Sequence, residues 1–392
     1  MQFKLFGKFR KYRLLAPGPV PMPPEVQKAL SEPMIHHRTP EFNGLLVSAL
    51  TQLNQVFLTE EPVMIHASTG SGAMESALVN TLSPGDEVIA INSGKFGERW
   101  AKMAEAHGIK AHIVEVQWGE AVTIEQVEEA LMRHTRAKAI LCQASETSTA
   151  TKHPIKEIAA ITSKRDDVLL MVDAITALGA MELPMDEYGI DVVVSGSQKA
   201  FMIPTGLGFI SLSKKAWKFN ESAKCPRFYF DVKAEMEANK KGQTFFSSSV
   251  SHIKALNLAL KKMLEPNLDY TIERTQRLAD ATREACGILG LKMFSNSPSP
   301  AVTAVLVPEN IDGQKLRNHI EEKYNVTVIG GQDKLKGKIL RIGHLGWIEN
   351  SDLKVGIEAI GLGLKDLGHN ITQETIREAV LKTGEILEST RH

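Results

Sequence analysis

The 392-residue sequence has only three cysteines, Cys142, Cys225 and Cys286, which are widely spaced. An odd, scattered set of this kind forms neither a disulfide framework nor a zinc-ligand pattern, so it fits a reducing, cytoplasmic setting. Net charge is also absent, because 46 basic residues balance 46 acidic ones. A chain without excess charge has no general attraction to nucleic acid or to an anionic membrane surface.

Long apolar runs are missing as well. No uncharged apolar stretch reaches the roughly 18 residues that a membrane-spanning helix needs, so we expect no membrane span. The segment Met1–Lys11 is basic and contains three phenylalanines. It lacks the apolar core of a secretory signal and the serines of an organellar presequence. We expect residues 1–20 to form a solvated tail or an arm that lies across a partner subunit.

The segment Ala67–Ser76 lacks the features of two nucleotide-binding motifs. No Gly-Lys-Ser/Thr follows it, which excludes a Walker A loop, and the third glycine of a dinucleotide fingerprint is missing. It predicts a helix start made of small residues. There the backbone around Ser71, Gly72 and Ala73 can approach an anion, which the helix dipole also favours. An ordinary Ser/Gly helix start explains the segment about as well.

Lys199 ends the apolar strand in Val192–Phe201 and has small residues around it. Partial desolvation of an ammonium group lowers its pKa from about 10.4 and frees an amine for imine chemistry. The alternative is a lysine that caps the strand end or pairs with a carboxylate.

A second apolar run, Val168–Asp173, ends in a carboxylate 26 residues before Lys199. An acid at the carboxyl end of a buried parallel strand lies where open α/β sheets bind ligands. Asp173 is alternatively the N-cap of a following helix. Together the acid and the lysine suggest a pyridoxal 5′-phosphate site, in which the lysine forms an imine and the carboxylate keeps the pyridine nitrogen protonated.

With these three elements in this order, the chain resembles the class V aminotransferases, which are fold-type I pyridoxal phosphate enzymes. Within them it is similar to the branch of alanine–glyoxylate and serine–glyoxylate (or serine–pyruvate) aminotransferases. It also resembles bacterial members often labelled as soluble hydrogenase small subunits. The resemblance extends from Leu14–Val20 to Ile339–Gly346, and Ser195–Lys199 is its most specific motif.

Strand-like and helix-like patterns alternate between residues 60 and 215, which predicts a mostly parallel sheet with helices on both faces. The expected strands are Val88–Ile91, His112–Val116, Ala139–Cys142, Val168–Asp173, Asp191–Ser195 and Phe209–Leu212. The expected helices include Phe96–His107, Ile124–His134, Ile155–Lys164 and Val250–Leu264. The family resemblance implies that this sheet is of the seven-stranded type of fold type I.

A chain of this length exceeds one comfortable core, so we expect a large cofactor-binding domain over residues 21–265 and a small α+β domain over residues 266–392. The small domain is predicted to contain the helices Thr271–Leu289, Ile357–Lys365 and Glu374–Leu387 and the strands Val302–Val307, Val326–Ile329 and Lys338–Ile342.

The resemblance implies a role for each matching residue. Lys199 and Asp173 are the catalytic pair, and Lys199 moves the proton between the substrate Cα and the cofactor. The backbone of Ser71, Gly72 and Ala73, together with Gln198, holds the phosphate. The family often has histidine or another polar residue where this chain has Ala73, so only its N–H can help here.

Other matches concern the ring and the substrate. Phe96 stacks on the pyridine ring, although a phenylalanine in such a loop is often a core plug. Thr147 touches the ring, in a motif that ends in Ala150 where the family usually has glycine; a need for positive φ there would strain alanine and displace the loop. Arg341 binds the substrate α-carboxylate, unless it forms a structural ion pair. The loop with Gly18 closes over the substrate.

Thr244 and Ser247 match hydroxyl residues that, in the family, reach the phosphate of the neighbouring subunit. The usual prolines are replaced here by Phe246 and Ser249, which weakens the match. If the contact exists, the chain acts as a homodimer with shared active sites.

Three further groups have no firm role. The pair His36-His37 has no third ligand, so we expect no metal site. Arg38 and Arg227 are candidates for binding a second substrate carboxylate.

We therefore predict transfer of an amino group from alanine or serine to glyoxylate or pyruvate, with pyridoxal 5′-phosphate as cofactor. Aspartate and aminoethylphosphonate are alternative donors that the sequence does not exclude. A cysteine desulfurase-like lyase on the same fold is disfavoured, because Val326–Arg341 contains no cysteine. A non-catalytic accessory subunit has no need for Lys199, Asp173 and Arg341 together, and a nicotinamide oxidoreductase lacks its glycine fingerprint.

Overall fold

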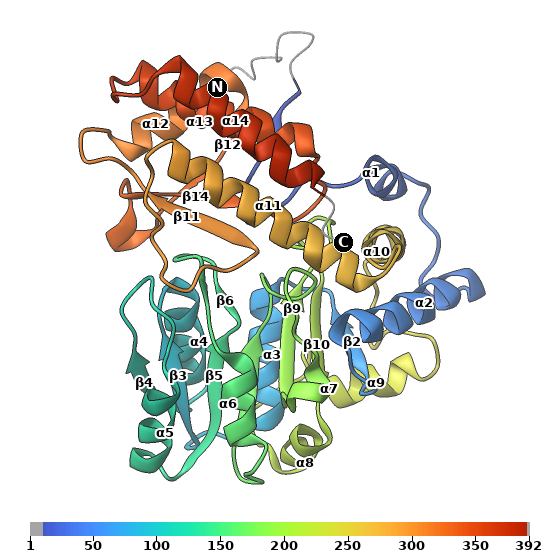
Figure 1. Ribbon diagram of the computed structural model, residues 1–392. Helices are drawn as coiled ribbons and strands as arrows, with labels where there is room; N and C mark the ends of the chain where they lie inside the picture. Colours follow the sequence, from blue (N-terminus) through green and yellow to red (C-terminus); the bar gives the residue numbers. More distant parts are fainter. Residues whose placement is uncertain (1–10, 390–392) are drawn as a thin grey trace.

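The structure is a computed structural model that describes residues 11–389, so the expected N-terminal arm before residue 11 lies outside the described residues. A seven-stranded sheet with helices around it forms the lower part of the view in Figure 1, and the C-terminal elements form the upper part. In the described part of the chain, no helix is both long and apolar enough to cross a membrane.

The large sheet has the strand order β2-β10-β9-β8-β5-β3-β4. The strands are β2 (Val63–His66), β3 (Glu87–Asn92), β4 (Lys110–Glu115), β5 (Ala137–Gln143), β8 (Leu169–Asp173), β9 (Val192–Gly196) and β10 (Gly208–Leu212). β10 runs antiparallel to both of its neighbours, and the pairs from β9 to β4 are parallel. The expected mostly parallel sheet and its six expected strands are confirmed. The expected ranges did not include β2, a short apolar run at the edge of the sheet.

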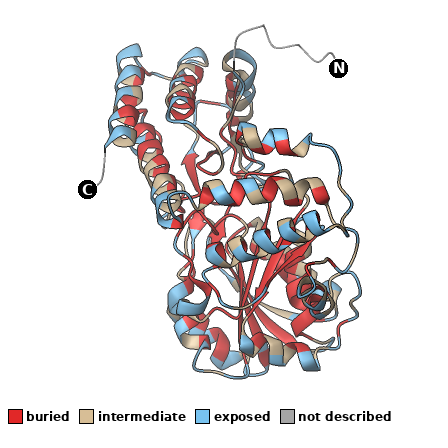
Figure 2. Cartoon of the chain, turned by 90° about the vertical axis from the view of Figure 1, so that its right-hand side faces the viewer, coloured by how far each residue is buried: buried red, intermediate tan, exposed pale blue. Residues whose placement is uncertain are grey.

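Helices cover both faces of this sheet, because its strands other than the edge strand β4 are buried on both sides. In β3, Ile89 and Ile91 join the core on one face, whereas Val88 and Ala90 join the core on the other. Figure 2 shows the buried residues concentrated in these strands. The surrounding helices are α1 (Pro24–Leu30), α2 (Pro40–Phe57), α3 (Gly70–Thr81), α4 (Lys95–Ala106), α5 (Ile124–Arg133), α6 (Ile155–Thr162), α7 (Met185–Tyr188), α8 (Lys214–Ser222), α9 (Val232–Asn239) and α10 (Val250–Met263).

The C-terminal part has its own apolar core and a three-stranded antiparallel sheet of order β11-β14-β13. Its elements are α11 (Leu268–Ile288), β11 (Val302–Leu306), α12 (Gly313–Tyr324), β12 (Val326–Thr327), β13 (Ile329–Gly330), η1 (Asp333–Leu335), β14 (Ile339–Gly343), α13 (Asn350–Asp366) and α14 (Gln373–Glu388). The single strand expected over Val326–Ile329 is divided into β12 and β13, which pair with different partners. Helix α13 begins before the expected Ile357 because Glu349 and Asp352 form a capping box.

The described part of the N-terminal segment is built into this C-terminal core. β1 (Arg13–Leu14) pairs in parallel with β12, and the Leu15 side chain is only 1% exposed. The Gly343 N–H donates to the Leu15 carbonyl at 2.8 Å. A Cβ on Gly343 would lie 2.3 Å from the backbone carbon and oxygen of Ala16, so only glycine fits there. The domain boundaries at residues 20 and 265 stay predictions.

We expect Gly343→Ala to lower the free energy of unfolding by about 1–3 kcal/mol, because the added methyl group overlaps the backbone of residue 16. The matched control is Gly44→Ala in α2, where a new Cβ has no neighbour within 4 Å. That change should raise the free energy of unfolding by about 0.5–1 kcal/mol, since alanine favours helix. Urea unfolding of the two variants checks both signs. Equal stability of Gly343→Ala and the parent would contradict the close packing.

Candidate active site

The site forms where three neighbouring parallel strands end. β5, β8 and β9 are adjacent in the sheet, so their carboxyl ends share one edge. Asp173 is the last residue of β8, Lys199 follows the end of β9, and the short β6 (Ser145–Glu146) follows β5. A hairpin with β7 (Thr151–Lys152) then carries the chain away from the edge. The sheet therefore brings the expected acid and lysine together.

Lys199 is almost fully covered, with 8% of its surface exposed. Its Nζ donates to the carbonyl of Pro17 at 2.6 Å. A Cβ on Gly18, whose φ is +135°, would lie 2.5 Å from the same nitrogen, so a glycine is needed where this loop passes over the amine. Burial lowers the pKa of Lys199 to about 8; Asp173 opposes this shift, and the Arg341 and Arg99 charges add to it. A large fraction of Lys199 is therefore a neutral amine at mildly basic pH.

Asp173 is 5% exposed, and its Oδ1 accepts the N–H of Ile175 at 2.9 Å. Burial raises the pKa of Asp173 to about 7; the Ile175 N–H opposes this, and the charge of Glu146 adds to it. Among the ion pairs of residues 11–389 there is none that involves Asp173. A buried carboxylate of this kind gains most from a cation beside it, such as a protonated pyridine nitrogen.

The start of α3 has the form expected of a phosphate cradle. Thr69, its N-cap, makes no side-chain cap, and its carbonyl accepts the Gly72 N–H at 2.9 Å. The Ala73 N–H donates to the same carbonyl at 3.3 Å, so of Ser71, Gly72 and Ala73 it is the Ser71 N–H that is not directed at Thr69. A first-turn N–H without such a partner points toward an approaching anion. A Cβ on Gly72 would lie 2.8 Å from the Ser68 side chain, so the turn is tightly packed. Ser71 Oγ accepts a hydrogen bond from Arg99 at 3.2 Å.

Gln198 contributes a second observation at this cradle. Its Oε1 is buried and has no hydrogen-bond partner within the described chain. A Cβ on Gly196 would lie 3.1 Å both from this oxygen and from the Gly70 Cα, so the amide lies beside the start of α3. An unpaired acceptor oxygen needs a donor and does not itself favour an anion, so a phosphate at the start of α3 would take its hydrogen bond from the Gln198 amide nitrogen.

Phe96 is the second residue of α4 and is only half-buried. It belongs to none of the apolar cores of the described residues, so the core-plug interpretation is wrong. The guanidinium carbon of Arg99 lies 4.8 Å from the centroid of the Phe96 ring. One face of the ring is thus covered by a cation.

Thr147 contacts two other parts of the site. Its Oγ1 lies 2.6 Å from the Oγ1 of Thr176, and its carbonyl accepts a hydrogen bond from Arg341 Nη1 at 3.0 Å. Ala150, at the end of the same motif, has a φ of +60°. The expected need for a left-handed residue is confirmed, and alanine meets it at a cost of about 1 kcal/mol.

Arg341, in β14, is 4% exposed. Its Nε and Nη2 donate to the Gly330 carbonyl at 3.1 and 2.8 Å, and no carboxylate of the described residues pairs with it. The structural ion-pair interpretation is therefore wrong. Arginine has five N–H donors, and these contacts with Gly330 and Thr147 leave one on each terminal nitrogen, which is the pair that holds a carboxylate. Burial lowers the pKa of Arg341 to about 10, and Glu146 opposes that shift.

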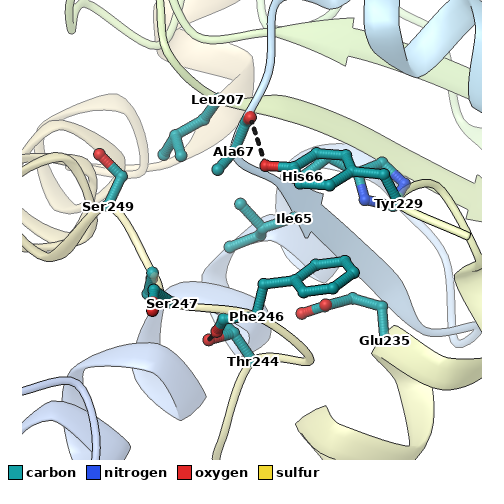
Figure 3. A pocket seen from close by; sticks show the side chains of 11 residues that line it. Ile65, His66, Ala67, Leu207, Tyr229, Glu235, Thr244, Phe246, Ser247 and Ser249 are labelled. Carbon is teal, nitrogen blue, oxygen red and sulfur yellow. Dashed lines mark hydrogen bonds between the residues drawn. The ribbon is translucent and has the colours of Figure 1, made fainter.

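Thr244 and Ser247 lie outside this cluster. They line a small hollow together with Ile65, His66, Ala67, Leu207, Tyr229, Glu235, Phe246, Ser248 and Ser249. Figure 3 shows it, with the hydrogen bond of 3.2 Å from the Tyr229 hydroxyl to the Ala67 carbonyl. The Thr244 hydroxyl donates to the Phe246 carbonyl at 2.6 Å. Neither Lys199 nor Asp173 lines this hollow, so it is separate from the cluster at the sheet edge.

The two arginines proposed for a second carboxylate are engaged elsewhere. Arg227 donates to the backbone carbonyls of Val79 and Ala223, each at 3.1 Å. Arg38 donates to Gln243 Oε1 at 2.7 Å and to the Thr244 carbonyl at 3.2 Å. None of these contacts joins either arginine to Lys199, Asp173 or Arg341, and a role in binding a second carboxylate stays a prediction. In residues 11–389 no group of three His, Cys, Asp or Glu side chains is placed to hold a metal ion.

Sequence reasoning missed two side chains and one carbonyl. Glu146 is fully buried beside Thr147, Arg99 links α3 to Phe96, and the Pro17 carbonyl binds Lys199. A signal for Glu146 existed, since it is an acid just beyond a buried strand, as Asp173 is. The other two had no local signal, because their contacts depend on how distant segments pack.

Comparison with known proteins shows which family the chain belongs to. The family model described as "Aminotransferase class-V" matches residues 25–342. The chain belongs to the class V aminotransferase family. It is therefore an aminotransferase of a family that uses pyridoxal phosphate, and the residues described above fit that cofactor. The expected resemblance is confirmed.

Curated relatives of this class V aminotransferase include proteins named as glyoxylate aminotransferases. It is 36% identical over 363 residues to the soluble hydrogenase small subunit of a Synechococcus strain, covering 92% of this chain and 94% of that one. It is 35% identical to the L-aspartate–glyoxylate aminotransferase of Paracoccus denitrificans, with 91% of both chains covered. The serine–glyoxylate aminotransferase of Hyphomicrobium methylovorum is 33% identical, again with 91% of both covered.

Solved structures share the fold of this aminotransferase. The ureidoglycine–glyoxylate aminotransferase of Bacillus subtilis superposes with a TM-score of 0.91, covering 97% of this chain and 100% of that one at 24% identity. The aspartate aminotransferase of Thermus thermophilus gives 0.82 at 28% identity, covering 93% and 99%. The fold is that of the fold-type I pyridoxal phosphate aminotransferases, as expected.

The titration of Asp173 predicts a pH-dependent stability of the cofactor-free protein. The folded chain holds the Asp173 proton more tightly than the unfolded chain, since burial raises its pKa from 3.8 to about 7. The free energy of unfolding therefore falls as the pH rises from about 4 to about 7. Asp173→Asn should remove this fall, and its stability advantage should grow from pH 5 to pH 8, reaching on the order of 3–4 kcal/mol.

Urea unfolding of the cofactor-free proteins across this pH range measures the effect. A contrasting control is Asp366→Asn, because Asp366 pairs with Lys323 at 2.7 Å and accepts the Tyr324 hydroxyl at 2.6 Å, and these contacts lower its pKa. That variant should be less stable than the parent throughout. Parallel pH profiles for Asp173→Asn and the parent would show that the buried carboxylate does not titrate as described.

Proposed function

We propose that this class V aminotransferase transfers an amino group from a small amino acid, alanine or serine, to a small 2-oxo acid, glyoxylate or pyruvate. The observation that carries the proposal is the buried Lys199 amine, which lies within electrostatic reach of both Asp173 and Arg341. Relatives named as serine–glyoxylate and aspartate–glyoxylate aminotransferases support glyoxylate as the acceptor, and the first of them supports serine as the donor.

The chain offers groups for each part of pyridoxal phosphate. The start of α3 and Gln198 would hold the phosphate, Phe96 and Thr147 would contact the ring, and Asp173 would hold a proton at the ring nitrogen. When bound, the cofactor supplies an electron-withdrawing ring that accepts the electron pair released at the substrate Cα.

The remaining steps belong to side chains of this protein. Arg341 binds the substrate α-carboxylate with its two free terminal N–H groups and so orients the Cα–H bond. Lys199, as a neutral amine, accepts the proton from the substrate Cα, becomes an ammonium group, and would give this proton up to the cofactor to complete the amino transfer. The backbone at Pro17 and Gly18 covers the Lys199 amine and excludes water from it.

Two observations favour a small neutral donor for aminotransfer over the alternatives. The second cation near Lys199 is Arg99, and it is already engaged with Ser71 and the Phe96 ring, which disfavours a dicarboxylic donor. A desulfurase needs a reactive thiolate, but burial raises the pKa of Cys142, Cys225 and Cys286.

Half-reactions test the proposal directly. The purified protein loaded with pyridoxal phosphate is mixed with single amino acids, and its cofactor absorbance is followed. Alanine or serine should change the spectrum, and glyoxylate or pyruvate should restore it. Lys199→Arg should lose at least about 10³-fold in rate, because a guanidinium stays protonated and cannot accept the Cα proton. The control is Lys215→Arg, since this lysine pairs with Asp191 away from the site. Reaction only with large aromatic donors, or full activity of Lys199→Arg, would contradict the proposal.

We also propose that the protein acts as a homodimer in which Thr244 and Ser247 complete the phosphate site of the partner. The surface beside these residues supports this. Phe228 is 73% exposed and Tyr229 47%, and Phe246 packs against both rings with centroid distances of 5.7 and 4.9 Å. Clustered exposed aromatic rings are typical of interaction surfaces.

Mixed dimers test the sharing of sites. Subunits with Lys199→Ala are mixed and reassembled with subunits that carry Thr244→Ala and Ser247→Ala. In the mixed dimer, one site combines an intact lysine with intact partner hydroxyls, so activity should rise to about half of the parent per mixed dimer. Sedimentation measures the assembly state. No recovery on mixing, or an active monomer, would contradict shared sites.

A further inference from the structure

Glu146 is a fully buried carboxylate, with 0% of its surface exposed, that the reaction as described does not use. Its Oε2 accepts the N–H groups of Phe96 at 3.0 Å and Gly97 at 3.1 Å. Its Oε1 accepts the N–H of Ser148 at 2.9 Å and the Ser148 hydroxyl at 2.5 Å. Four donors thus converge on one side chain.

These contacts make Glu146 the cap of a helix far away in the sequence. The N-cap of α4 is Gly94, which has no side chain and makes no cap. The first three N–H groups of α4 end instead on the Glu146 carboxylate and on Ser148 Oγ, which accepts the Lys95 N–H at 2.9 Å. A Cβ on Gly94 would lie 2.5 Å from the carboxyl carbon of Glu146. The loop before α4 is therefore shaped around this anion, which the positive end of the helix also stabilises.

The ionised form is the one that fits the contacts. Burial raises the pKa of Glu146, and its four hydrogen bonds with Ser148, Gly97 and Phe96 oppose that shift. A protonated carboxyl would point an O–H at donors, whereas an ionised carboxylate accepts from all four.

The same residue connects groups on different sides of the site. Through Phe96 it fixes the ring expected to lie on the cofactor. Through the adjoining Thr147 carbonyl it borders the hydrogen bond that holds Arg341. Its charge raises the pKa of both Arg341 and Asp173, because it stabilises the Arg341 cation and destabilises the Asp173 anion. Phe96, Asp173 and Arg341, which are expected to contact the cofactor ring, its nitrogen and the substrate carboxylate, are thus all influenced by Glu146.

We propose that Glu146 is a positioning residue for the reaction: its anion fixes the Phe96 ring against the cofactor and keeps Thr147 and Arg341 in place for the substrate carboxylate. This rests on the proposed function. A purely structural helix cap is the competing explanation, and it predicts loss of stability without a change at the site.

The test compares Glu146→Gln with Thr123→Ala. Glutamine has the same size but offers a single acceptor oxygen, so two of the four donors lose their partner. Thr123 caps α5 in a capping box and is our control for a helix cap with no link to the site. Both variants should lower the melting temperature. Only Glu146→Gln should weaken binding of pyridoxal phosphate to the cofactor-free protein, by at least about tenfold, and raise the KM for the amino donor.

A double-mutant cycle shows whether Glu146 acts through Phe96. The affinity for pyridoxal phosphate is measured for Glu146→Gln, Phe96→Leu and the double variant. If Glu146 positions the ring, its removal should cost at least threefold less affinity in the Phe96→Leu protein than in the parent. Full additivity, or a Glu146→Gln protein that differs from Thr123→Ala in no property of the site, would overturn the proposal.

A charge readout completes the test. Because the Glu146 charge raises the pKa of Asp173, the pH profile of cofactor affinity should move to lower pH in Glu146→Gln and stay in place in Glu146→Asp.

Ser148→Ala is the variant to use if Glu146→Gln does not fold. It removes one donor to Glu146 and the contact with the Lys95 N–H, and it should weaken cofactor affinity more than Thr123→Ala does. Failure of the parent to bind pyridoxal phosphate would refute the proposed function itself, whereas a normal parent with unaffected variants would refute this inference alone.

Discussion

The organisation of the site depends on keeping an amine out of water. Lys199 has one hydrogen bond in the described chain, to the Pro17 carbonyl, and no carboxylate touches it. Burial destabilises an ammonium group in that setting, which lowers the pKa of Lys199 and increases the fraction of the neutral amine that proton transfer needs. Two other features of the site fit a buried amine. Gly18 lets its loop pass close to the Lys199 nitrogen, and Asp173 at the end of β8 lies near Lys199 without forming an ion pair with it.

The charged side chains of the site influence one another's pKa values without forming salt bridges. Four charged side chains of the site are nearly or fully buried: Asp173, Glu146, Arg341 and Lys199. The two cations among them, Arg341 and Lys199, donate their hydrogen bonds to backbone carbonyls. Acids and bases that are not joined in salt bridges remain available for a ligand that brings its own charges. A phosphate, a pyridinium and a carboxylate are such charges, and the site offers a complementary group for each.

The sequence predicted the large sheet well because its strands are buried on both faces and appear as plain apolar runs. The ends of those runs also placed Asp173 and Lys199 correctly, since parallel strands share one carboxyl edge. Other features were not predictable from local patterns. β12 and β13 form one apolar run in the sequence and separate only because β1 pairs with the first and β14 with the second. The cap of α4 comes from residues about 50 positions later, and no periodicity reports such a contact.

The pairing of β1 with β12 has a consequence for synthesis of the chain. The residues that cover the Lys199 amine leave the ribosome first, but the strand that anchors them and the glycine that receives them, Gly343, are made near the end. During translation the large sheet can assemble around an amine that is still uncovered and hydrated. The nascent protein therefore has no completed cofactor pocket until nearly all of its length has emerged, which delays catalysis until both parts of the molecule exist.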